Sequence, residues 1–315
     1  MHYIGIDIGG TSIKCGFVSK EGKIFHRFGF PIDHKENQVD TIKRLANLVL
    51  INIKEINKKK EDFAGIGIGC PGSINSITGV CCFSNNLGWL DLPIVEIMEK
   101  ETHLKCKISN DANVAMLGEA SFGAGRNFKN SVLLTLGTGV GGGLFLNGKL
   151  YEGNEGKGAE LGHVIIEKDG YPCTCGLKGC LETYASVTGL IRMSKEEMNK
   201  NKSSLMWDYV NKDINKVDGK TAFECAKKGD GSALKVVNKY EDYLTIGILN
   251  YCNIFRPEAI ILGGGVSNQK EYLTDALLKK VKAHNYGFKG TPEVKILVSN
   301  LGNDAGLLGA AALFM

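Results

Sequence analysis

The chain has 315 residues, of which 43% are hydrophobic and 23% charged, a composition that excludes a disordered, collagen-like or coiled-coil protein. The formal net charge of +4 is too small to indicate a nucleic-acid surface, so we expect no nucleic-acid partner. The apolar start is broken by Asp7, and the uncharged stretch between Lys129 and Lys149 is glycine-rich, so we expect neither a secretory signal nor a membrane partner.

The first third of the chain predicts a strand meander followed by helices and further strands. Apolar residues from Ile42 to Ile56 recur at spacings of three and four, which indicates an amphipathic helix. Another helix begins near Pro93, and an alanine-rich helix follows Asp111. The expected strands cover 3–8, 13–18, 23–30 and 63–69. Residues 105–109 are expected to form the end of a further strand.

The same pattern returns in the second half of the chain. A strand at 131–136 is followed by a glycine turn and a strand at 143–147, and a turn at Gly148 leads into 149–151. A later strand at 258–262 also ends in glycines. Strand, glycine turn and strand therefore occur near residue 10 and again near residue 139, which predicts two related α/β halves.

The glycines of the second turn, Gly137-x-Gly139-x-x-Gly142, have the spacing of the dinucleotide-binding fingerprint but not its structural context. That fingerprint requires a helix after the third glycine, whereas here a short apolar run ends at Asn147-Gly148 and predicts a hairpin. The Walker pattern of P-loop proteins is absent from the sequence. The sequence therefore argues against both a dinucleotide oxidoreductase and a P-loop fold.

Two glycine hairpins at equivalent places can instead point their backbone N–H groups at a polyphosphate. Lys14 offers a positive charge to a phosphate, and Asp7 is placed to hold Mg²⁺ through water. The remaining nucleotide contacts predicted in this way are Gly9, Gly10, Thr11, Gly137, Thr138 and Gly139.

A cluster of metal-ligating residues lies in the middle of the chain. His163, Cys173, Cys175 and Cys180 give the spacing H-x9-C-x-C-x4-C, a tetrahedral Zn²⁺ set with no open position. We therefore expect a structural zinc site. The other seven of the ten cysteines show no such spacing and are expected to be small core or near-surface residues. Ten cysteines without a predicted secretory signal indicate a cytoplasmic protein with reduced thiols.

Five motifs, in this order and spacing, resemble the ROK family of sugar kinases and repressors: DIGGTSIK, NDANVA, LGTGVGGG, ELGH and CTCGLKGC. The resemblance implies the actin/hexokinase-like ATPase superfamily, an α/β fold with two RNase H-like lobes and a nucleotide and sugar cleft between them. It implies an N-terminal lobe of 1–116, on which a C-terminal helix of about 304–315 packs back. The C-terminal lobe would be 117–303, with the zinc knuckle.

The resemblance also implies roles for particular residues. Asp111 would be the base that accepts the proton of the attacking sugar hydroxyl, although from the sequence alone either Asn110 or Asp111 is a candidate helix cap. Gly264 and Gly265 would lie near the adenosine. The sugar contacts would be Asn110, Asp111, Glu160, His163 and Glu182, with Gly72 and Asn86 from the loops after the early strands.

The activity implied is ATP-dependent transfer of a phosphate to a hexose, and the full motif set, with SNNLGW at 84–89, looks most like a glucokinase acting on the 6-hydroxyl of glucose. N-acetylmannosamine kinases share almost all of these motifs, and kinases of fructose, allose and N-acetylglucosamine stay open. A sugar-sensing repressor would carry a DNA-binding segment ahead of the first glycine turn. Because that turn begins at residue 9, we do not expect a repressor. The expected cofactors are ATP, Mg²⁺ and structural Zn²⁺, and the expected assembly is a homodimer.

Overall fold

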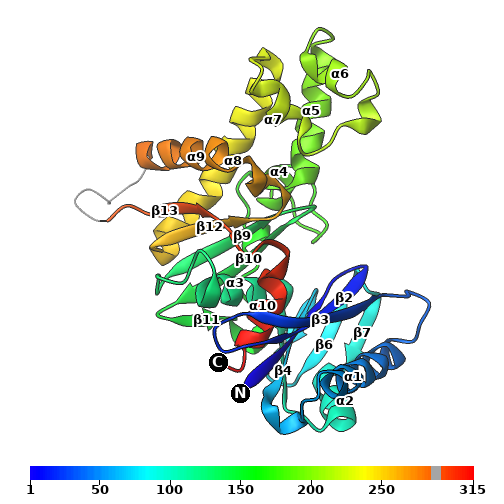
Figure 1. The fold of residues 1–315 in the computed structure, drawn as a ribbon. Helices are drawn as coiled ribbons and strands as arrows, with labels where there is room; N and C mark the ends of the chain where they lie inside the picture. The colour runs from blue at the N-terminus through cyan, green and yellow to red at the C-terminus, as the bar shows by residue number, and fades with distance from the viewer. Residues whose placement is uncertain (285–291) are drawn as a thin grey trace. The chain divides into compact units, whose positions relative to one another are not determined.

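The computed structural model describes residues 1–284 and 292–315 and divides into two compact units (Figure 1). Unit 1 comprises Met1–Lys129, Gly143–Ala159 and Asn300–Met315, and unit 2 comprises Asn130–Gly142 and Glu160–Ser299. Unit 1 therefore contains residues 117–129, 143–159 and 300–303, which the sequence-based division assigned to the second lobe.

The main sheet of unit 1 has the strand order β3-β2-β1-β4-β8. Strand β1 pairs antiparallel with β2 and parallel with β4, and β4 pairs parallel with β8. The carboxyl ends of β1, β4 and β8 therefore meet at one edge of the sheet, where the register places Asp7 beside Gly69 and Cys70 beside Asn110. The bounds are β1 His2–Ile8, β2 Ser12–Val18, β3 Ile24–Pro31, β4 Phe63–Cys70 and β8 Cys106–Asn110.

The helices of unit 1 follow the predicted pattern. The stripe from Ile42 to Ile53 is buried, which confirms the expected helix, and Asn37 caps it by accepting a hydrogen bond from Val39 N at 2.9 Å. A small sheet of β5, β6 and β7 was not predicted. The bounds are α1 Gln38–Glu55, α2 Ile94–Thr102, α3 Asp111–Phe122, α10 Ala305–Ala312, β5 Ser73–Asn75, β6 Val80–Ser84 and β7 Trp89–Leu92.

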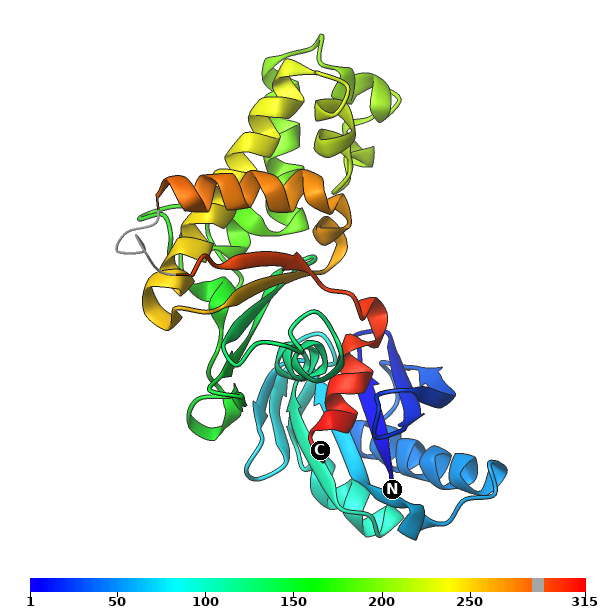
Figure 2. The same ribbon diagram turned by 60° about the vertical axis from the view of Figure 1, so that its left-hand side comes forward.

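Helix α10 brings the end of the chain back to the first sheet (Figure 2). It packs against α3, β1 and β4, and its small residues Ala310 and Ala311 are fully buried. Leu307 and Leu308 join Tyr3 and Val18 in a separate apolar cluster. The first turn of α10 is thereby held close to the carboxyl end of β1.

A second sheet has the order β11-β10-β9-β12-β13, in which β12 pairs parallel with both β9 and β13. If the strands of each sheet are numbered from one in sequence order, both sheets have the order 3-2-1-4-5. This confirms the prediction of two related α/β halves, and the strand after Gly139 confirms the predicted hairpin. The bounds are β9 Ser131–Leu136, β10 Val140–Leu146, β11 Lys149–Tyr151, β12 Ala259–Gly263 and β13 Lys295–Val298.

The helices of unit 2 are dominated by α8, which Asp230 caps by accepting a hydrogen bond from Ala233 N at 2.7 Å. The segment 195–220 buries Met198 and Met206 completely. Among the described residues, no helix is long and apolar enough to cross a membrane. The bounds are α4 Glu182–Ala185, α5 Val187–Lys200, α6 Leu205–Tyr209, α7 Thr221–Ala226, α8 Gly231–Phe255 and α9 Glu271–Ala283. Short 3₁₀ helices span Lys60–Asp62, Asn154–Gly156, Leu161–His163, Ile214–Lys216, Gly265–Gln269 and Gly302–Asp304.

Candidate active site and metal centre

Asn110 and Asp111 lie where β8 passes into α3. Asn110 is the N-cap: its Oδ1 accepts from Ala112 N at 2.9 Å, and its Nδ2 donates to Gly72 O at 3.0 Å. Asp111 Oδ1 also accepts from Ala112 N at 2.9 Å. The cap is therefore Asn110, and Asp111 is fixed in the first helical turn.

Two carboxylates of unit 1, Asp7 and Asp111, lie at this edge of the sheet, at the ends of β1 and β8. Loss of surrounding water raises the pKa of Asp111, although hydrogen bonds from backbone N–H groups and from Asn110 oppose that rise. Burial also raises the pKa of Asp7, the charge of Lys14 opposes the rise, and the charge of Asp111 adds to it. A divalent cation would relieve this repulsion, so these oxygen donors fit Mg²⁺.

The first glycine turn joins β1 to β2 next to these carboxylates. Gly9 N donates to Ser12 O at 2.9 Å, and the β1–β2 register sets Lys14 opposite Asp7. A Cβ atom on Gly10 would lie 3.9 Å from the Cβ of Asn86, so the structure brings the predicted Asn86 to this turn. Thr11, Lys14 and Asn86 all have exposed side chains.

The sequence did not point to two other neighbours of this site. A Cβ atom on Gly306, in the first turn of α10, would lie 2.9 Å from the Asp7 Cγ atom. Ser109, which precedes Asn110, donates a hydrogen bond to Glu152. Both contacts join residues far apart in the chain, and neither belongs to a recognisable motif.

In unit 2, the second glycine turn and the Gly264–Gly265 pair lie side by side. Both follow parallel strands, β9 and β12, whose register pairs Gly263 with Thr135. Gly264 has a φ of +78°, and a Cβ atom there would lie 2.5 Å from Leu136 O, at the entry to the Gly137 turn. The crevice outside the carboxyl ends of parallel strands is a common ligand site in α/β sheets.

We expect Gly264→Ala to lower the free energy of unfolding by about 1–3 kcal/mol, because alanine is strained at this φ and would press on backbone. Gly265→Ala is the matched control, since a Cβ atom there would meet nothing within 4 Å. Urea unfolding of both variants measures the difference. Equal stability of the two variants would contradict the close packing at Gly264.

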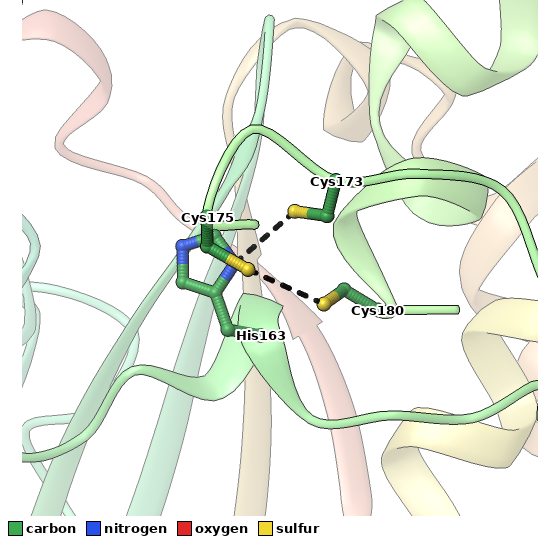
Figure 3. A group of neighbouring side chains, drawn as sticks. All are labelled: His163, Cys173, Cys175 and Cys180. Atoms are coloured by element: carbon green, nitrogen blue, oxygen red, sulfur yellow. Dashed lines mark hydrogen bonds between the residues drawn. The ribbon is translucent and has the colours of Figure 1, made fainter. Parts of the chain in front are cut away.

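The four predicted zinc ligands come together in unit 2 (Figure 3). Cys173 Sγ lies 3.5 Å from His163 Nδ1, Cys175 Sγ lies 3.7 Å from Cys180 Sγ, and all four ligand atoms lie within 4.8 Å of one another. A tetrahedral Zn²⁺ separates neighbouring nitrogen and sulfur ligands by about 3.5–3.8 Å. Three thiols and one imidazole at these separations therefore fit zinc.

The ring of His163 presents Nδ1 to the thiols, and its other nitrogen points away from them (Figure 3). Buried tyrosines hold the segments on either side of the cluster: Tyr251 donates to Leu161 O at 2.5 Å, and Tyr240 donates to Ala185 O at 2.8 Å. Their burial leaves these two hydroxyls few alternative partners. These two bonds anchor the segments on either side of the cluster to helix α8.

The predicted sugar contacts of unit 2 flank this cluster. The exposed residue Glu160 directly precedes the turn Leu161–His163, and its backbone oxygen accepts from His163 N at 3.1 Å. Glu182 Oε2 accepts from Val140 N at 3.0 Å, and its Oε1 lies 3.6 Å from Cys173 Sγ. Six of the remaining cysteines are buried, as predicted, and Cys82 is half-buried.

The sequence model of the ROK family matches residues 3–315. The chain is 40% identical to a glucokinase of Thermotoga maritima, covering 98% of this chain and 96% of that one. It is 39% identical to a glucokinase of Halalkalibacterium halodurans, covering 99% and 94%. A crystal structure of a ROK family glucokinase from Streptomyces griseus, in complex with glucose and AMPPNP, matches with a TM-score of 0.80 at 31% identity, covering 99% of both chains.

Proposed function

The chain belongs to the ROK family, and from that premise we propose that it is an ATP-dependent kinase that phosphorylates the 6-hydroxyl of glucose. The observation that carries the proposal is Asp111, a carboxylate fixed in the first turn of α3 beside an amide cap and a second carboxylate. The similarity to glucokinases over nearly the whole chain supports the choice of sugar.

In this mechanism glucose O6 attacks the γ-phosphorus of ATP, and Asp111 accepts the proton of that hydroxyl. The new bond joins O6 to phosphorus, and the bond from phosphorus to the β–γ bridging oxygen breaks, so ADP leaves. Little covalent chemistry falls to the protein in phosphoryl transfer, and positioning and charge stabilisation supply most of the rate. The hydrogen bond from Ala112 N to Asp111 Oδ1 limits the motion of the base.

We assign the phosphates of ATP to backbone N–H groups of the two glycine turns, around Gly9–Thr11 and Gly137–Gly139, with Lys14 as a positive charge. Gly264 and Gly265 would bind the adenosine. Mg²⁺, when bound, would neutralise phosphate charge, and Asp7 is the residue we assign to hold it through water.

We assign sugar hydroxyls to Asn110, Gly72 and Asn86 of unit 1 and to Glu160, His163 and Glu182 of unit 2. Carboxylates accept hydrogen bonds from sugar hydroxyls, and amide and imidazole N–H groups donate to sugar oxygens. Because His163 Nδ1 faces the thiols, a bound Zn²⁺ would leave the proton on Nε2, which fixes a donor for the sugar.

The pKa of Asp111 predicts how activity depends on pH. The base works only when ionised, and its pKa is raised by loss of surrounding water. The value of kcat/KM should therefore fall as pH is lowered through that raised pKa, and the midpoint should lie above the ordinary range of an aspartate. Initial rates from pH 4 to 9 measure it, and a profile flat down to pH 4 would contradict Asp111 as the base.

A coupled assay of ADP release tests the substrate. We expect glucose to give the highest kcat/KM in a panel with mannose, fructose, N-acetylglucosamine and N-acetylmannosamine. A preference for N-acetylmannosamine or another of these sugars would keep the mechanism and change the assignment of the sugar. Absence of ADP release with every hexose would refute the proposal.

We further propose a cytoplasmic homodimer. The free cysteines suit a reducing compartment, and the family resemblance supports the dimer. Light scattering after size-exclusion chromatography tests the assembly, for which a dimer mass is the expected result.

A further inference from the structure

The second glycine turn is held in place by one short segment, Glu182–Thr188. Val187 N donates to Gly137 O at 2.8 Å, and Thr188 Oγ1 donates to Thr138 O at 2.8 Å. Glu182 accepts from Val140 N at 3.0 Å. Backbone groups of Gly137, Thr138 and Val140 therefore have partners in a single stretch of chain.

Glu182 provides the charged contact in this set. Its Oε2 lies so close to the turn that a Cβ atom on Gly139 would be 2.2 Å away from it. The residue at 139 must therefore lack a side chain while the carboxylate keeps its place. A carboxylate would repel a phosphate at the same point, so its bond to Val140 N suits a residue that orients the turn rather than one that binds nucleotide.

The same carboxylate touches the metal cluster. Glu182 Oε1 lies 3.6 Å from Cys173 Sγ and 3.5 Å from Thr174 Oγ1, and Glu182 follows the ligand Cys180 by two residues. At the far end of the segment's first helix, Tyr240 donates to Ala185 O at 2.8 Å. The segment is thus fixed between the cysteine cluster and the buried face of α8.

We propose that Glu182 is a positioning residue for the phosphate-binding turn Gly137–Gly139, and that the ordered zinc cluster sets its orientation. This rests on the proposed function, which assigns that turn to the phosphates of ATP. Glu182 consequently serves the nucleotide as well as the sugar. Nucleotide affinity should depend on Glu182 even when no sugar is present.

The test uses the full chain as Glu182→Ala and Glu182→Gln, with Glu167→Ala as a control carboxylate beside the cluster but outside the segment. Calorimetry measures the affinity for MgADP without sugar, and amide hydrogen exchange measures protection of Val140. We expect Glu182→Ala to weaken MgADP binding about tenfold and to speed Val140 exchange by a similar factor, as for the loss of a hydrogen bond to a charged group. Glu182→Gln keeps an acceptor oxygen and should stay within about twofold of wild type, as should Glu167→Ala.

The measurements test separately the bond to Val140, the positioning role of Glu182, the proposed function and the role of the metal. Unchanged Val140 exchange in Glu182→Ala would overturn the inference, because the bond would not be holding the turn. Faster exchange with unchanged MgADP affinity would overturn the positioning role. A wild-type protein that binds no MgADP would overturn the proposed function itself, while the exchange data would still report whether Glu182 holds the turn. Zinc removal by a chelator should speed Val140 exchange in wild type, and unchanged exchange would overturn the part assigned to the metal.

Discussion

Asp111→Asn should lower kcat on glucose by roughly 10²–10⁴-fold while leaving the fold intact, because the amide cannot accept the hydroxyl proton. Asparagine keeps the shape of the side chain and an oxygen that can accept from Ala112 N, as Asp111 Oδ1 does at 2.9 Å. The helix cap is a different residue, Asn110, so the start of α3 should be unaffected. Single-turnover phosphate transfer, measured alongside glucose affinity, checks the expectation.

Asp40→Asn is the matched control, since Asp40 is also an acidic residue in the first turn of a helix, α1, away from the site. It should keep the wild-type kcat. If Asp111→Asn turned over within about threefold of wild type, Asp111 would not be the base. If its unfolding midpoint fell well below that of Asp40→Asn, the loss of activity would reflect folding, and Asp111→Glu would then separate charge from geometry.

Loss of the metal cluster should have the second-largest effect. Cys175→Ser should reduce bound zinc from one equivalent to none and weaken glucose binding about 10- to 100-fold. The physical reason is that the Nε2 proton of His163 and the carboxylate of Glu182 both lose their fixed orientation. MgADP binding should weaken less, by the roughly tenfold expected for the loss of the Glu182 contact.

Zinc content by atomic emission and sugar affinity by calorimetry measure these effects. Cys82→Ser is the control, because Cys82 is a partly accessible thiol outside the cluster. It should match wild type in both measurements. Full glucose affinity in a Cys175→Ser protein that holds no zinc would show that the cluster does not support the sugar site.

The features that the sequence revealed are those built from neighbouring residues. The strand, glycine turn and strand around Gly9 need only local alternation and a turn, and the zinc set needs only ligand types at short spacing. The Asn110–Asp111 pair could be located at a helix start in the same way. Which of the two residues caps the helix depends on the backbone conformation. Asn110 is extended, with a φ of −63° and a ψ of 150°, and the order of residue types does not determine these angles.

The features that were missed depend on packing between distant segments. The approach of Gly306 to Asp7 requires α10 to lie on β1, and nothing near Asp7 in the sequence specifies that partner. The bond from Val140 N to Glu182 spans 42 residues. The small sheet of β5, β6 and β7 consists of strands of three to five residues, too short to show a clear alternation.

The central claim is that a single carboxylate, held at the start of α3, faces the hydroxyl that is phosphorylated. A crystal structure of the complex with glucose and a non-hydrolysable ATP analogue measures this directly. We predict that an Asp111 carboxylate oxygen lies within hydrogen-bonding distance of glucose O6, about 2.6–3.2 Å. Glucose bound with O6 out of reach of Asp111 and hydrogen-bonded to a different carboxylate would contradict the claim.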